Sequence, residues 1–183
     1  REFVPALSEL GLLPRRASLD ARAPVLLAPA GDSYLLFCQD SHLEARTRQR
    51  GLAAAASLAL LRAAMEAFSS FGAYAFDEDF GFLAPRLQDC GTGLCLESLV
   101  HLPALAQEGL VEKALRGLLS RGFQVKGFYG SEEGSLGDLW LVGTEWAFGA
   151  SEEDIASEFE AALAALARGE RKARAGLMRK RRE

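Results

Sequence analysis

Short connections between strand-like segments constrain the fold of this chain more than any other feature of its sequence. Residues 25–28, 34–38 and 42–48 have the lengths of β-strands, and the first two are rich in apolar side chains. Residues 29–32 and 39–41 separate them and contain the Pro, Gly, Asp and Ser that are typical of turns. Because connections this short join antiparallel neighbours, we predict an antiparallel meander in this part of the chain.

Helical patterns flank the meander on both sides. Residues 5–13 are predicted to form a short helix, and residues 52–71 a long one. In the long helix, apolar residues recur every three or four positions and form one face, and the alanines between them allow close packing against a sheet. These residues are Leu58, Leu61, Met65 and Phe68.

The second half of the chain alternates between strands and helices. Strands are predicted over residues 80–84, 95–102, 123–129 and 139–145, and a single helix is predicted from Pro103 to residue 120. The last helix begins with Ser151 as its N-cap and Asp154 three residues further on. This order of elements predicts an α+β fold with one core, built on an antiparallel sheet flanked by helices.

The composition is that of a globular domain that needs no cross-links. The 183 residues are 49% hydrophobic, and a chain of this length buries about 70% of the surface that its unfolded form exposes. Its cysteines, Cys38, Cys90 and Cys95, have no C-x-x-C spacing, which predicts no structural zinc and a reducing compartment, the cytoplasm. No segment approaches the roughly 18 apolar residues of a membrane-spanning helix, and the first residues lack the pattern of a signal peptide.

Charge is distributed unevenly along the chain. Residues 168–183 carry eight basic and two acidic residues, a net charge of +6, so the rest of the chain carries −10 of the total of −4. An acidic body disfavours nucleic acid as its ligand. The basic end is either a solvated cluster or a site for an acidic partner or nucleic acid. Nucleic acid would bind there only through Arg179, Lys180, Arg181 and Arg182, which have no aromatic residue among them for base stacking.

Five sequence blocks occur in a specific order and spacing. They are YAFDEDFGFL at residues 74–83, GTGL at 91–94, HLP at 101–103, GFYG at 127–130 and LGDL at 136–139. Together they resemble the catalytic domain of the ATP:guanidino phosphotransferases, and among these most closely the bacterial protein-arginine kinases. The resemblance runs from about residue 25 to about residue 174, and it divides the chain into an N-terminal helix and connection (1–24), a guanidino-kinase-like domain (25–167) and a basic tail (168–183).

The resemblance implies an antiparallel sheet across which Mg·ATP lies, with a guanidino substrate approaching the γ-phosphate. In such phosphoryl transfer, arginines and magnesium stabilise the charge on the phosphoryl oxygens, and a carboxylate holds the guanidinium nucleophile. Residues at the matching positions that would bind a nucleotide are His42, Arg46, Arg48, Gly91, Thr92, Gly93 and Lys126. No protein-held metal site is predicted, and Mg·ATP would be the only cofactor.

Most of the family's functional positions are substituted. Where the family reads Asn-Glu-Glu-Asp-His-Leu-Arg, this chain reads CQDSHLE at residues 38–44. Gln39 thus replaces one carboxylate, Asp40 stands at the position of another, and Glu44 replaces a phosphate-binding arginine. Arg86 lies in the stretch where the family has a substrate-contacting cysteine, and Cys95 stands where a second phosphate-binding arginine follows GTGL. Lys126 replaces a third arginine and keeps only its charge.

Three functions follow from this pattern. The leading hypothesis is a pseudokinase that binds a protein partner, an active kinase or its activator, in stress response or protein quality control. The second is an active ATP-dependent guanidino kinase whose phosphate clamp is rebuilt from Arg46, Arg48, Arg86 and Lys126. The third is a nucleic-acid-associated module that works through its basic tail.

Several residues keep two interpretations. Gly91, Thr92 and Gly93 either cradle a phosphate with backbone N–H groups or form a tight connection. Cys90 and Cys95 are either two small packed residues or a redox pair. Asp40 is either a surviving catalytic carboxylate or a solvated turn residue, and the two histidines, His42 and His101, are expected to be structural or on the surface.

Overall fold

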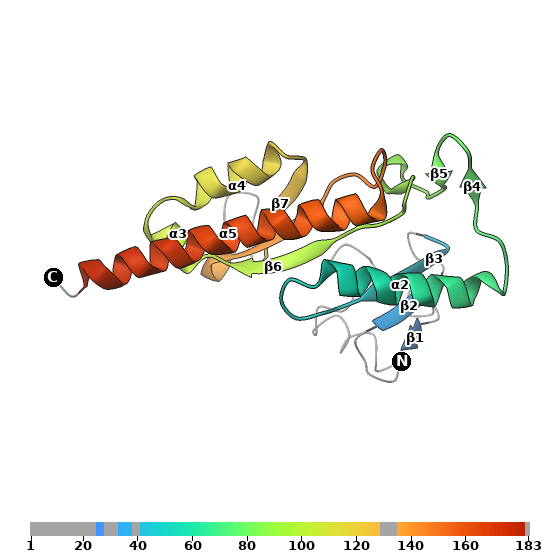
Figure 1. The fold of residues 1–183 in the computed structure, drawn as a ribbon, viewed down its shortest axis with the longest axis horizontal. Coiled ribbons are helices and arrows are strands. Elements are labelled where there is room, and N and C mark those ends of the chain that lie inside the picture. Colours follow the sequence, from blue (N-terminus) through green and yellow to red (C-terminus); the bar gives the residue numbers. More distant parts are fainter. Residues whose placement is uncertain (1–24, 28–32, 38–40, 129–134, 182–183) are drawn as a thin grey trace. The chain divides into compact units, whose positions relative to one another are not determined.

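A computed structural model describes residues 25–27, 33–37, 41–128 and 135–181 of the chain (Figure 1). It divides into two compact units, Arg1–Ala75 and Phe76–Glu183. The predicted helix over residues 5–13 and the predicted turns at 29–32 and 39–40 lie outside the described residues. Among the helices that the structure describes, none combines the length and the hydropathy of a membrane-spanning segment.

The first unit contains the predicted antiparallel meander. Strands β1 (Val25–Leu27), β2 (Ser33–Phe37) and β3 (Leu43–Thr47) pair in that order. Helix α2 (Ala54–Ser69) follows and packs on this sheet, with the Phe68 ring 5.6 Å from the ring of Phe37. The sequence pattern therefore predicted these elements correctly, with ends that differ by one to two residues.

The second unit is built on a three-stranded antiparallel sheet. Its strands lie in the order β6 (Glu97–His101), β8 (Leu139–Thr144) and β7 (Phe123–Gly127), so the last strand of the sequence lies in the middle. A short hairpin, β4 (Phe76–Asp77) with β5 (Gly81–Phe82), precedes it. Val142 on the central strand is fully buried. Among the described residues, the strands pair in three antiparallel sheets, one in the first unit and two in the second, as expected for the predicted antiparallel α+β fold.

Two helices connect β6 to β7 where one was predicted. Helix α3 (Pro103–Gln107) and helix α4 (Val111–Leu119) are separated at Gly109, whose φ of +68° is incompatible with a continuing right-handed helix. The prediction of one continuous helix from residue 103 to residue 120 is therefore wrong. Pro103 does open the first of the two helices, as expected.

The last element, α5 (Glu152–Lys180), is a helix of 29 residues that runs along the second unit (Figure 1). Its predicted N-cap is confirmed, because the Ser151 hydroxyl accepts a hydrogen bond from the N–H of Asp154 (3.1 Å). Phe159 anchors the helix on the sheet through its ring contact with Phe123 (6.0 Å). The predicted boundary at residue 167 falls inside this helix, which runs through it without a break.

Candidate functional site

The GTG segment of the second unit (residues 91–93) is hydrogen-bonded to two other parts of the chain. Gly91 exchanges two hydrogen bonds with Phe82 of β5 (2.8 and 3.1 Å). Thr92 donates from both its N–H and its hydroxyl to the carbonyl of Ala147 (3.0 Å each). The Thr92 hydroxyl also accepts from the N–H of Leu94 (3.2 Å). The segment therefore ties the β4–β5 hairpin to the loop before α5.

Two of the glycines here are required by close backbone contact. A Cβ on Gly81 would lie 2.6 Å from the carbonyl oxygen of Gly91, and a Cβ on Gly91 would lie 2.7 Å from that of Ala147. Both residues also have positive φ, +71° and +99°. The sequence alone gave the GTG segment two interpretations, phosphate cradle or tight connection, and these contacts support the tight connection.

A hollow of about 430 Å³ lies beside this junction. Its walls come from the GTG segment, the β4–β5 hairpin, the loop before α5 and the first turn of α5. The lining residues are Gly81, Gly91, Thr92, Ala147, Phe148, Gly149, Ala150, Ser151 and Asp154. Residues 147–154 were not predicted to lie at a site, because the contact of Ala147 with Thr92 spans 55 positions and leaves no local signal in the sequence.

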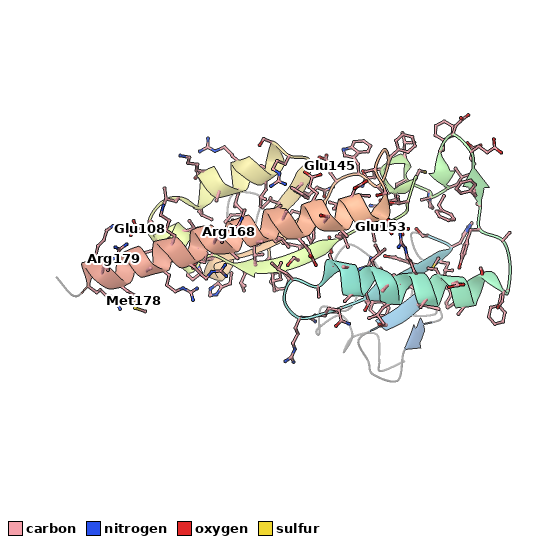
Figure 2. The ribbon with its side chains drawn as sticks, viewed as in Figure 1. Glu108, Glu145, Glu153, Arg168, Met178 and Arg179 are labelled. Carbon is pink, nitrogen blue, oxygen red and sulfur yellow. The ribbon has the colours of Figure 1, made fainter. Side chains whose placement is uncertain are left out.

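The hollow is poorly suited to an anion. The positive end of α5 already faces the carboxylates of Glu152, Glu153 and Asp154 in its first turn, and Figure 2 labels Glu153 at this end of the helix. Asp154 lines the hollow, and its carboxylate accepts a hydrogen bond from the Ser151 hydroxyl (2.6 Å). The N–H groups of Gly91 and Thr92, which could hold a phosphate, already bond within the protein.

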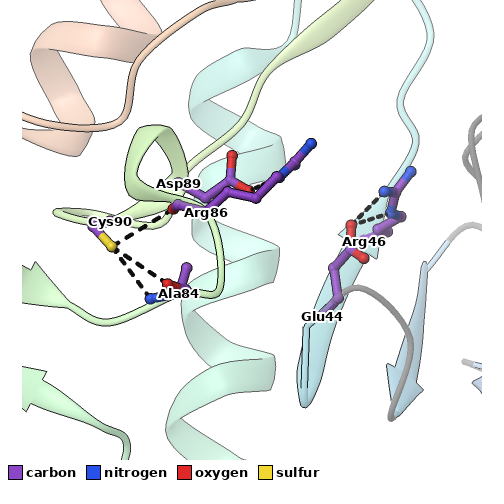
Figure 3. Close-up of polar contacts among 6 residues, drawn as sticks. All are labelled: Glu44, Arg46, Ala84, Arg86, Asp89 and Cys90. Carbon is purple, nitrogen blue, oxygen red and sulfur yellow. Dashed lines mark hydrogen bonds and ion pairs between the residues drawn. The ribbon is translucent and has the colours of Figure 1, made fainter.

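Arg86 lies in the loop before the short 3-10 helix η1 (Leu87–Asp89). Its guanidinium donates to the Asp89 carboxylate (Nε to Oδ2, 2.6 Å), an ion pair drawn in Figure 3. Next to it, the buried thiol of Cys90 contacts the backbone of Ala84 and Arg86 (3.4 to 3.6 Å). Cys90 is therefore a packing residue that shapes this loop.

Cys95, which the sequence comparison with the family predicts to replace a second arginine, is exposed. Desolvation raises the pKa of its thiol, as do the charges of Asp89 and Glu97, while a hydrogen bond with Thr144 and the charge of Arg86 act in the opposite direction. The net effect is a raised pKa, which favours the protonated thiol near neutral pH. Cys90 and Cys95 are both free thiols in the structure, rather than a disulfide.

The other candidates of the second unit lie on its sheet. Lys126 projects from β7, and its ammonium donates to the side-chain oxygen of Gln124 (3.0 Å). His101, at the end of β6, is exposed. Among the described residues, no cluster of three or more His, Cys, Asp or Glu side chains is arranged to hold a metal ion.

In the first unit, Glu44 and Arg46 lie on the same face of β3 and form an ion pair (Arg46 Nε to Glu44 Oε1, 2.6 Å; Figure 3). Residues two apart in a strand share a face, which brings these two side chains together. Arg48 lies just beyond the strand and His42 just before it, and both are exposed. Gln39 and Asp40 lie outside the described residues.

The chain matches the family model described as ATP:guanido phosphotransferase, C-terminal catalytic domain, over residues 12–173. It is 27% identical over 165 residues to the protein-arginine kinase of Shouchella clausii, covering 90% of this chain and 46% of that protein. It is 34% identical over 109 residues to the protein-arginine kinase of Caldanaerobacter subterraneus subsp. tengcongensis, covering 60% of this chain and 32% of that protein. The chain thus spans half the length or less of these two curated relatives.

Solved structures show the same fold. A taurocyamine kinase from Schistosoma mansoni, solved with bound transition state analog components, matches with a TM-score of 0.74 at 19% identity, over 91% of this chain and 24% of that one. A lombricine kinase matches with a TM-score of 0.69 at 18% identity, over 81% of this chain and 41% of that one. These likenesses confirm the predicted α+β fold. Together with the family match over most of the sequence, they confirm the resemblance drawn from the five motifs: the chain belongs to the ATP:guanido phosphotransferase family and corresponds to its C-terminal catalytic domain.

Proposed function

We propose that this chain is a non-catalytic, protein-arginine-kinase-like domain that acts by binding a protein partner in stress response or protein quality control. The observation that carries the proposal is the ion pair between Glu44 and Arg46. Glu44 stands where the family has a phosphate-binding arginine, and its carboxylate engages the neighbouring arginine that would have to replace it. A phosphate that approached this part of the chain would therefore meet the Glu44 carboxylate and an arginine whose charge is already paired.

The second unit supports the same conclusion. Arg86 is paired with Asp89, and Lys126 is hydrogen-bonded to Gln124. Losing one preorganised donor to a transition-state oxygen costs on the order of 3 kcal/mol, or roughly a hundred-fold in rate. Changes at Glu44, Cys95 and Lys126 together would remove most of the catalysis that the fold supports in its relatives.

The nucleotide that the family implies also fits the described residues poorly. Mg·ATP brings several negative charges, whereas the hollow beside the GTG segment is lined by the Asp154 carboxylate and presents N–H groups that already have partners. We assign no phosphoryl-transfer step to this chain. A protein-binding role uses the fold of the family without requiring the phosphate clamp.

The proposal is tested by titrating Mg·ATP and Mg·ADP into the purified chain by calorimetry at physiological salt. We expect no saturable heat and no shift in melting temperature, because a ligand that binds the native state must raise its stability. The matched variant is Glu44→Arg with Cys95→Arg, which restores two arginines of the family pattern. It is expected to bind nucleotide more tightly than the original chain.

A protein-arginine phosphorylation assay completes the test, with a full-length protein-arginine kinase as positive control. We expect no transfer by this chain. Saturable nucleotide binding, together with phosphorylation that is lost in Arg46→Ala or Lys126→Ala, would overturn the proposal and establish the rebuilt clamp instead.

A further inference from the structure

The C-terminal third of α5 presents a groove that is separate from the hollow beside the GTG segment. Residues 171, 174, 175, 178 and 179 line it, and the groove has a volume of about 640 Å³. Their spacing of three and four residues places them on one face of the helix. This end of α5 projects beyond the strands of the second unit (Figure 1).

The groove is lined by both apolar and basic side chains. Ala175 and Met178 supply the apolar part, and Met178 is 61% exposed. Arg171, Arg174 and Arg179 supply the charge. Figure 2 labels Met178 and Arg179 near the C-terminal end of the helix. In the part of the chain that the structure describes, Arg174 pairs with Glu170, and no ion pair is recorded for Arg171 or Arg179.

Basic residues near a helix C-terminus have an ordinary explanation, because they interact favourably with the helix dipole. That explanation covers Arg179 and Lys180 in the last turn. It accounts neither for Arg171, more than two turns earlier, nor for a large apolar side chain exposed between arginines. An apolar strip bordered by positive charge is instead typical of a surface that receives an amphipathic partner.

Contacts from α3 and its C-terminal residue hold this helix end in place. The Lys180 ammonium donates to both carboxylate oxygens of Glu108, which follows α3 (3.0 Å each). Immediately before the groove, the buried Glu170 carboxylate accepts hydrogen bonds from two N–H groups of α3. A partner would therefore meet a helix that is already ordered, which lowers the entropic cost of binding.

The charges define what kind of partner fits. Arginine presents planar donors that match carboxylates, and the apolar part of the groove needs an apolar row beside them. A nucleic acid fits less well, because the groove has no aromatic residue for base stacking and residues 1–167 carry a net charge of −10, which repels a long polyanion. An acidic protein segment satisfies both the charge and the apolar strip.

We propose that this face of α5 is a docking site for an acidic, amphipathic helical segment of a partner protein. The inference rests on the proposed function in one respect, since it names the surface and the chemistry by which the partner would bind. The partner's leucine-type side chains cover Ala175 and Met178, and its carboxylates reach Arg171 and Arg179.

The probe is a synthetic helical peptide of about 20 residues, labelled with a fluorophore, with leucines at i, i+3, i+4 and i+7 and glutamates beside them. Binding is followed by fluorescence anisotropy against the full chain. We expect saturable binding that weakens at least tenfold in Arg171→Glu/Arg179→Glu and in Met178→Gln. The matched control, Lys113→Glu/Arg116→Glu, reverses two charges on the exposed face of α4 and should leave binding unchanged.

Two comparison ligands make the outcome decisive. A peptide in which serine replaces each leucine, and a single-stranded DNA of equal charge, are expected to bind at least tenfold more weakly. Equal binding of these ligands, no binding of the amphipathic peptide, or equal loss in the α4 control would each overturn the docking site. Thermal melting shows whether each variant is folded.

The nucleotide titration on the same samples separates this inference from the proposed function. Peptide binding at α5 in a chain that also binds Mg·ATP and phosphorylates arginine would leave the docking site standing and refute the non-catalytic proposal. A chain that binds neither ligand would keep the non-catalytic proposal and refute the docking site.

Discussion

The Glu170 carboxylate on α5 accepts a hydrogen bond from the backbone N–H of Ala104, 66 residues earlier in the chain (3.1 Å). Its second oxygen accepts from the N–H of Leu105 (3.0 Å), and the Arg174 guanidinium donates to the first (3.1 Å). Helix α3 has no side-chain cap of its own, so the first turn of α3 depends on a charged acceptor from another helix to satisfy these N–H groups. Glu170 is itself only 5% exposed.

Replacing Glu170 by alanine is expected to lower the free energy of unfolding by roughly 3 kcal/mol, because two buried N–H groups lose a charged acceptor. Urea unfolding followed by circular dichroism measures the change. Glu112→Ala removes an exposed carboxylate on α4 that pairs with Arg116 and should cost less than about 1 kcal/mol. Equal losses in the two variants would contradict a capping role for Glu170.

Glu170 should also make the stability of the second unit depend on pH. Burial by itself raises the pKa of this carboxyl, but the N–H groups of Leu105 and Ala104 and the pairing with Arg174 outweigh it and hold the pKa below 4.5. A carboxyl whose pKa is lower in the folded state stabilises the fold above its unfolded pKa, and this contribution is lost as the pH falls through the folded pKa.

Chemical denaturation from about pH 6 to about pH 3 tests this. The stability difference between the wild type and Glu170→Gln is expected to shrink as the pH falls below 4.5. A difference that stays constant over this range would show that the charge of Glu170 contributes nothing.

Gly91→Ala is expected to destabilise the GTG junction by roughly 1 to 3 kcal/mol, because the new Cβ would require both an unfavourable φ and displacement of the Ala147 carbonyl. Gly176→Ala lies within α5 with open space around it and should stabilise the chain by about 0.5 to 1 kcal/mol. Thermal melting of both variants provides the measurement. Opposite signs are the expected result, and a neutral Gly91→Ala would refute the close contact.

Cys95 is expected to react slowly with iodoacetamide near neutral pH although it is exposed, since desolvation raises the pKa of its thiol. Its labelling rate should rise with pH more steeply around pH 9 than that of an unhindered model thiol. Cys90 is buried and should react only when the protein unfolds. Mass spectrometry of labelled peptides distinguishes the two sites, and fast labelling of Cys95 at pH 7 would contradict the raised pKa.

Features coded by neighbouring residues were predictable. The meander follows from short turns between apolar runs, and α2 follows from the spacing of Leu58, Leu61, Met65 and Phe68. The start of α5 follows from Ser151 and Asp154, whose interaction spans three residues. The break at Gly109 is also local, but a glycine within a helical pattern is compatible with either a break or a continuing helix, and only its positive φ decides between them.

Residue identity and short-range order are enough to identify the family and the alternation of strands and helices, because both leave local patterns in the sequence. Three features become visible only in the folded chain: Glu170 caps α3, residues 147–154 line a hollow with the GTG segment, and Arg171, Met178 and Arg179 share an exposed groove. The first two are contacts between residues more than fifty positions apart in the chain, and the third depends on which face of α5 the rest of the unit leaves uncovered. The local periodicity of a sequence shows neither which distant residues meet nor which face of a helix stays uncovered.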